Sequence, residues 1–364
     1  MVLKIATGNL QLNPFFRIRL GSPITCDLFL ENKTLELPSP LYLKLFTKLT
    51  NLISKKEIIT VIQQTFSLDD AESNEVLDNL ISNKLLVDSK YGDGKLQGIQ
   101  HWIDRGWLDA LLLHLKSCDL EFDDSINDEP DNFNSEGFRE LIRQEGLPEF
   151  WKEIKGINTV NLPNPTKLPT NYSFDEILLK RRSNRPWKQK TIELQELSNI
   201  LHYSNIETVR LRTEAETNLE EKPELLLNSA FSALETYFFA FNIEGLEPGL
   251  YHYDPKNHAV ILIKDGMFRD ELVHMVIGQD RPKNAACAFV ISAVWSRYMY
   301  RYRHPRAYRT LLVNIGELAQ KYLTLGTAYD YSTFLTPALR DEYADSMLGV
   351  NGYEEAPLYV VAIG

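Results

Sequence analysis

An acidic, polar segment divides this chain of 364 residues and limits how it can fold. Between Glu121 and Glu136 the sequence is rich in Asp, Asn and Glu, contains a proline and has few apolar side chains to bury. Such a segment cannot build a hydrophobic core, so we interpret it as a surface linker and the main domain boundary. The chain is also too long for one small domain. We predict a domain over residues 1–120, a linker with a connecting helix over residues 121–170, and a second domain over residues 171–364.

The first domain has the pattern of a winged-helix-like module. Its alternating and helical periodicities predict a strand, a hairpin, three helices and a final strand. These lie at Phe16–Leu20, Thr25–Leu37, Pro40–Leu49, Ser54–Phe66, Asp69–Asn83 and Lys84–Asp88. The third helix, which would enter a DNA groove, carries five acidic residues and no Lys or Arg before Lys84. Phosphates would be repelled, so we expect no DNA binding, while peptide binding at a sheet edge and a purely structural role both remain open.

Charge and cysteine usage exclude several classes of partner. The net charge of −11 argues against nucleic acid and anionic membranes, which both require a broad basic surface. Three isolated cysteines, Cys26, Cys118 and Cys287, form no CxxC pair and predict neither a disulfide framework nor a metal site. We find no signal-peptide pattern at the N-terminus and no run long enough to span a bilayer. The expected location is the cytoplasm.

A basic cluster opens the second domain of this otherwise acidic protein. Arg181, Arg182 and Arg185 flank Ser183 within five positions. Guanidinium groups are planar forks that match phosphate oxygens, so an anion clamp is one interpretation of the cluster. A solvated basic turn is the other, and the cluster alone does not decide between them.

The remainder of the second domain predicts mixed helices and strands, hence an α+β fold. Helical periodicity predicts a helix that delivers the basic cluster and a second helix over Ile192–Tyr203. The polar stretch Ile206–Lys222 is expected to be a loop. Phe238–Phe241 is typical of a buried strand, and Glu244–Pro255 predicts a turn at Pro248-Gly249, a short strand and a second turn.

Together with the basic cluster, the Glu244–Pro255 run resembles flavin-dependent nitroreductase-fold enzymes of the SagB/ThcOx type. These dehydrogenases oxidise azolines to azoles in peptide natural products. Arg306–Arg309 resembles the arginine-tyrosine motif that opens the long helix of the family, and Ala288–Trp295 resembles its central strand. Pro357–Gly364 resembles its closing strand. The resemblance implies a nitroreductase-like α/β sandwich preceded by a winged-helix-like, peptide-recognition-like domain.

The resemblance also implies a cofactor and a site. Members of the family bind FMN at a dimer interface to which both subunits contribute. The implied cofactor residues are Arg181, Arg182, Ser183, Arg185, Asn228, Ser229 and Gln320. Where the family has a Lys-Tyr pair, this chain has Arg301 and Tyr302. A guanidinium keeps its proton at usable pH and cannot act as a base, whereas a tyrosine can donate a hydrogen bond or exchange a proton.

Several positions around the implied flavin ring depart from the family pattern. The flavin loop is replaced by Leu226–Ala233, a Gly-His pair by Gly316-Glu317, and a glycine pair by Asp330-Tyr331-Ser332. A carboxylate and a tyrosine ring there would repel or crowd an anionic cofactor. The phosphate end therefore resembles the family more closely than the ring end does.

Two functions of different classes follow from this pattern. The chain is either an FMN-dependent dehydrogenase acting on a peptide, or a weakened partner subunit that completes a related enzyme or presents its peptide. In both cases the expected partners are a modified precursor peptide and a second subunit, in a homodimer or a heterodimer. A third interpretation, a nitroreductase for small quinones or nitroarenes, would make the first domain dispensable for activity.

Overall fold

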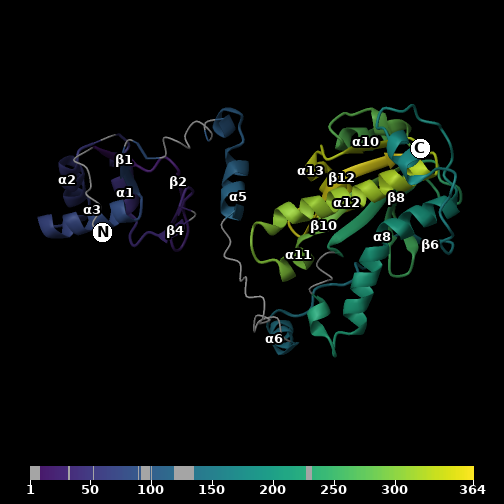
Figure 1. Ribbon diagram of the computed structural model, residues 1–364, viewed down its shortest axis with the longest axis horizontal. Helices are drawn as coiled ribbons and strands as arrows, with labels where there is room; N and C mark the ends of the chain where they lie inside the picture. The colour runs from purple at the N-terminus through teal and green to yellow at the C-terminus, as the bar shows by residue number, and fades with distance from the viewer. Residues whose placement is uncertain are drawn as a thin grey trace. The chain divides into compact units, whose positions relative to one another are not determined.

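The computed structural model describes residues 9–31, 33–51, 53–88, 90–91, 99, 101–118, 135–226 and 232–364. It divides into two compact units, Met1–Asp123 and Asp124–Gly364. Figure 1 shows the helices and strands of each unit. The fold is α+β, as predicted, with a small N-terminal unit and a larger unit built on one main sheet.

The small unit follows the predicted order of elements. Its strands are β1 (Leu10–Leu12), β2 (Phe16–Arg19), β3 (Thr25–Leu28), β4 (Lys33–Glu36) and β5 (Leu86–Asp88). Its helices are α1 (Leu41–Lys48), α2 (Lys55–Phe66), α3 (Asp70–Ser82) and α5 (Leu108–Cys118). Ser54 and Asp69 begin α2 and α3 with capping boxes, in which each side chain accepts a hydrogen bond from the third backbone N–H of its helix. Leu45, Ile58, Leu77 and Leu80 are among the core residues that join these helices to the strands.

The larger unit is organised around a seven-stranded antiparallel sheet with the order β11-β12-β10-β7-β8-β9-β6. The strands are β6 (Asn158–Asn161), β7 (Leu234–Ala240), β8 (Gly249–Asp254), β9 (Ala259–Asp265), β10 (Cys287–Val294), β11 (Thr333–Thr336) and β12 (Glu355–Ile363). The predicted buried strand, turn-flanked strand, central strand and closing strand are thus confirmed as β7, β8, β10 and β12.

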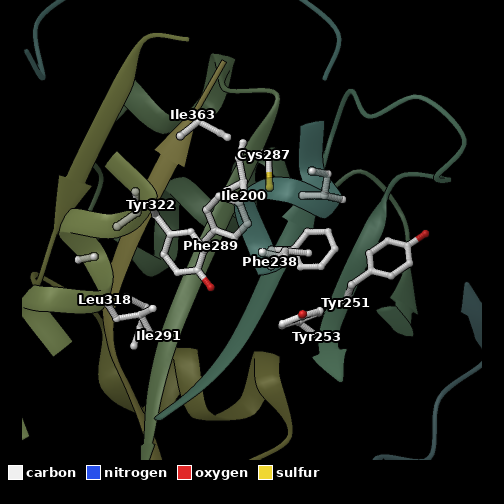
Figure 2. Packing of buried hydrophobic residues seen from close by; sticks show 14 of the residues in the cluster. Ile200, Phe238, Tyr251, Tyr253, Cys287, Phe289, Ile291, Leu318, Tyr322 and Ile363 are labelled. Atoms are coloured by element: carbon white, nitrogen blue, oxygen red, sulfur yellow. The ribbon is translucent and has the colours of Figure 1, made fainter. Parts of the chain in front are cut away.

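Helices cover both faces of this sheet. The helices of the larger unit are α6 (Ser135–Glu145), α7 (Phe174–Lys180), α8 (Leu194–Thr217), α10 (Arg269–Met275), α11 (Trp295–Arg301), α12 (Ala307–Ala328) and α13 (Asp341–Leu348), with short 3-10 helices η2 (Pro223–Leu225) and η4 (Arg281–Asn284). Residues of α8 and α12 pack on one face, and residues of α10 and α13 pack on the other. In Figure 2 the rings of Phe289 and Tyr322 stack between β10 and α12, with centroids 4.3 Å apart.

The loop predicted over Ile206–Lys222 is wrong, because α8 continues without a break to Thr217. Its second half is polar on the outside, where Arg210 pairs with Glu207 and Glu214 at helical spacing. Its inner side buries Leu211, Arg212 and Ala215. Arg212 occupies a core position where an apolar residue is expected, so the sequence does not show the amphipathic pattern of this half of α8.

The last turn of α12 lies directly against β12. A Cβ at Gly326 would come within 2.9 Å of the Ile363 side chain, so only glycine allows this approach. The chain then turns at Asp330, which has a left-handed φ of +65°. Tyr331, the next residue, is fully buried. The packing of Gly326 and Tyr331 on either side of Asp330 therefore fixes the position of the Asp330 backbone at the end of the sheet.

Among the described residues, no helix is both long enough and apolar enough to cross a membrane.

Candidate functional site

The basic cluster lies at the C-terminal end of α7, where the helix stops. Arg181 is the C-cap, with extended backbone dihedrals, and its N–H still donates to Ile177 at 2.9 Å. Arg182 is exposed and donates to the Arg181 carbonyl, while Arg181, Ser183 and Arg185 are half-buried. The end of α7 thus presents the predicted residues as one irregular turn.

An arginine from elsewhere in the chain joins this turn. Arg281, at the start of η4, donates to the backbone carbonyl of Arg185, and its guanidinium lies 5.2 Å from the ring centre of Trp187. Burial lowers the pKa of Arg281 below its ordinary value. Sequence analysis missed this residue because it is isolated among other residue types, 96 positions after Arg185.

Two N–H groups in this region are buried and have no hydrogen-bond partner among the described residues: Nη1 of Arg185 and Nε of Arg281. A buried cationic donor without an acceptor is costly in free energy. Both groups could be satisfied by an anion with several oxygens, such as a phosphate. The residues present therefore fit the phosphate end of a cofactor, and we call Arg185, Lys188 and Arg281 the anion cradle.

The anion cradle already contains one carboxylate, that of Asp330. Lys188 donates a hydrogen bond to it, and Arg185 Nη2 lies 3.8 Å from its Oδ1. The hydrogen bond from Lys188 is the main reason why the pKa of Asp330 falls below its ordinary value. The ring of Tyr331, which we expected to crowd a cofactor, instead enters the core, where its hydroxyl bonds to Glu196.

Tyr302 lies in a different place, in the wall of an aromatic cleft of about 830 Å³. The cleft is formed by Trp295, Tyr298, Met299, Tyr302, His304, Tyr308 and Leu311, with Leu147 and Pro148 opposite. Tyr302 ends α11, and its ring centre lies 5.0 Å from that of Tyr298 and 5.0 Å from the Arg301 guanidinium carbon. Burial raises the pKa of Tyr298 to about 12, so Tyr298 stays a neutral phenol.

His304 is a further candidate that sequence analysis did not identify. Its imidazole lines the cleft, with its ring centre 6.0 Å from that of Tyr302. Its Nδ1 is buried and has no hydrogen-bond partner among the described residues. Imidazole exchanges protons near neutral pH more readily than a phenol does. The available signal was its position, two residues after Tyr302, within a run otherwise dominated by Arg and Tyr.

A short segment that starts at the last residue of α6 closes one side of the cleft. Side chains of α11 and of the turn after α11 hold this segment in place. Arg303 donates to both oxygens of Glu145 at 2.6 and 2.8 Å. Arg297 donates to the Glu149 carbonyl at 2.6 Å, and the Tyr300 hydroxyl donates to Gly146 at 3.1 Å. We call residues 145–149 the strap. Arg297 and Arg303, two of the five arginines between Arg297 and Arg309, thus bind the strap.

Behind the strap lies a buried charge cluster that sequence analysis also missed. Glu235 of β7 is 2% exposed and contacts Arg212 at 3.1 Å, His252 at 3.0 Å, and Arg297. Burial opposes its charged form, yet the charges of Arg212 and Arg297 hold its pKa well below the ordinary value. Arg297 therefore joins this cluster to the strap, because the same guanidinium contacts Glu149.

Within the part of the chain that the structure describes, the basic cluster and Tyr302 are not brought together. Tyr302 lines the cleft together with residues of the first turn of α12, whereas Asp330, which Arg185 contacts, lies beyond the last turn of this helix. Figure 1 shows α12 running along the sheet. The helix has 22 residues and is about 33 Å long. Gln320 is exposed on α12 between these ends and donates to Thr324. Asn228 and Ser229 lie outside the described residues.

Comparison with known proteins identifies the family to which this chain belongs. A model of the nitroreductase family matches residues 178–364. The trifolitoxin operon protein TfxC of Rhizobium leguminosarum bv. trifolii is 34% identical over 315 residues, covering 85% of this chain and 86% of TfxC. The trifolitoxin-processing protein TfxB of the same organism is 29% identical over 126 residues, or 32% of each chain. A chain of the Escherichia coli microcin synthetase McbBCD complex, solved with truncated pro-MccB17 bound, is 17% identical with a TM-score of 0.38, covering 74% of this chain and 97% of that one. The chain belongs to the nitroreductase family.

Proposed function

We propose that this chain is a subunit of an FMN-dependent dehydrogenase that oxidises azoline rings in a peptide. The observation that carries the proposal is the pair of buried N–H groups of Arg185 and Arg281 that have no hydrogen-bond partner among the described residues, beside the basic cluster of a nitroreductase-family chain. Similarity to TfxC over most of the chain, and to TfxB over about a third of it, supports a peptide natural product as the substrate.

In this proposal the FMN phosphate binds to the anion cradle, assisted by Arg181, Arg182 and Ser183. FMN, when bound, accepts the hydride that leaves the azoline ring. The chain itself supplies cationic N–H donors at one end of α12 and an aromatic cleft at the other. A site that needs both must therefore take them from two subunits. We propose a dimer in which the cradle of one chain faces the cleft of another, as a homodimer or with a related chain.

The cleft provides groups suited to the proton that azoline oxidation also releases. The Nδ1 of His304 has no hydrogen-bond partner in the described part of the chain, and the imidazole can accept that proton. Tyr302 can donate a hydrogen bond that orients the ring, while Arg301 lies against its π-face. The apolar walls exclude water and suit a heterocycle with its neighbouring side chains.

Two substitutions test these roles on a synthetic peptide that carries one thiazoline. Tyr302→Phe removes only the hydroxyl, and His304→Gln removes the titratable group but keeps a polar side chain. We expect each to lower kcat by about 10²-fold or more, measured by mass spectrometry as the loss of two hydrogens. Tyr343→Phe, which removes a hydroxyl on α13 outside the cleft, is the matched control and should change kcat less than about threefold. Unchanged turnover of both variants would remove the cleft from the reaction.

A second candidate function is that of a partner subunit that holds no flavin of its own. The observation in its favour is the Asp330 carboxylate in the anion cradle, where an anionic cofactor would have to bind. In this case the chain would complete a flavin site on a related subunit or present the peptide, with the small unit as the candidate peptide-binding module. Purified chain would then show no flavin absorption even after FMN is added.

A further inference from the structure

Asp330 contacts two of the three cations that form the anion cradle. Its carboxylate accepts a hydrogen bond from Lys188 and lies 3.8 Å from Arg185. The positions of these groups follow from the fold. Asp330 lies just after α12 at a left-handed φ, and the Ser332 hydroxyl donates to the Pro186 carbonyl at 2.6 Å. This bond holds the turn after α12 against the turn that carries Arg185.

The contacts of Asp330 satisfy only part of the cradle. Although Asp330 lies close to Arg185 Nη2, the Nη1 of the same guanidinium and the Nε of Arg281 have no partner among the described residues. The Asp330 side chain is 43% exposed, so it can move towards solvent without breaking core packing. The cradle therefore contains the partly exposed Asp330 carboxylate together with N–H donors that a larger anion could use.

We propose that Asp330 is an internal counter-ion that competes with the FMN phosphate for the anion cradle and so limits how tightly this chain binds its cofactor. This inference rests on the proposed function and deepens it. A carboxylate at this place repels a phosphate and reduces the attraction of Arg185 and Lys188 for it. Cofactor loading then depends on displacing Asp330 from Arg185.

The test is an FMN titration of the full-length chain, followed by quenching of flavin fluorescence. Asp330→Asn is the informative variant, because Asn has the same shape, lacks the charge and also tolerates a left-handed φ. We expect its Kd for FMN to fall by roughly fivefold relative to the wild type. Glu247→Gln removes one charge from an exposed position between β7 and β8 and should leave the Kd unchanged.

Repeating Asp330→Asn in a protein that lacks its cationic partners tests whether the change in Kd arises at the anion cradle. In protein that carries both Arg185→Gln and Lys188→Gln, the substitution Asp330→Asn should lower the Kd by less than it does in the wild-type background, because both cations that the carboxylate contacts are gone. Circular dichroism spectra that match the wild type establish that each variant is folded.

The outcomes separate this inference from the proposed function. If Asp330→Asn leaves the Kd unchanged or raises it while the wild type binds FMN, the counter-ion role is wrong and the dehydrogenase proposal stands. An equal gain in the background that lacks both Arg185 and Lys188 would also overturn the role. If neither wild type nor Asp330→Asn binds FMN, both proposals fall.

Discussion

Replacing Glu235 by Gln is expected to lower the free energy of unfolding by about 3–5 kcal/mol. The change keeps the shape of the side chain but leaves Arg212 and Arg297 buried without their shared carboxylate. Both arginines are at least 95% buried, so solvent cannot replace the lost interaction. Urea denaturation followed by tryptophan fluorescence measures the difference.

Glu207→Gln is the matched control for this variant. Glu207 also pairs with an arginine of α8, but both side chains are about half exposed, so we expect a loss below about 1 kcal/mol. A Glu235→Gln protein as stable as the control would show that the buried cluster contributes little. The variant should also loosen the strap, because Arg297 holds both Glu235 and Glu149.

Removing the donors of the anion cradle is expected to abolish FMN binding at micromolar concentrations. Hydrogen bonds to charged groups contribute about 1.5–3 kcal/mol each, so Arg185→Gln or Arg281→Gln alone should weaken binding by at least about tenfold. The double variant should weaken it by about 10²-fold or more. Equilibrium dialysis against FMN measures the effect without any peptide substrate.

The control for the cradle variants is Arg210→Gln. This residue is an exposed arginine on α8 that pairs with Glu207 and Glu214, so its loss changes the net charge equally. FMN affinity should be unaffected. If the cradle variants bind FMN as tightly as this control does, the phosphate does not bind at the cradle, whatever the oligomeric state.

The sequence predicted features that depend on neighbouring residues. The starts of α2 at Ser54 and of α3 at Asp69, the turn after β8 and the apolar run into β7 follow from local patterns, and the structure contains each of them. The turn predicted at Pro248-Gly249 lies earlier, at Glu244-Gly245, and Gly249 already begins β8. The basic cluster was visible for the same reason. Its three arginines lie within five positions in an acidic chain.

Features that depend on distant contacts could not be derived in this way. Arg281 reaches the basic cluster only because η4 folds back beside Trp187. Glu235 is a single acidic residue at the start of an apolar strand, and its partners lie on α8, β8 and α11. The separation of Tyr302 from Arg185 depends on the length of α12 and on what packs at its two ends.

The central claim is that the cradle of one chain and the cleft of another form a shared flavin site. Size-exclusion chromatography of the full-length chain after incubation with FMN tests it, with light scattering for mass and visible absorption for flavin. We predict that flavin co-elutes with a dimer at about one FMN per chain and is absent from monomer. Flavin on the monomer would contradict a shared site, and a dimer without flavin would contradict FMN binding by this chain.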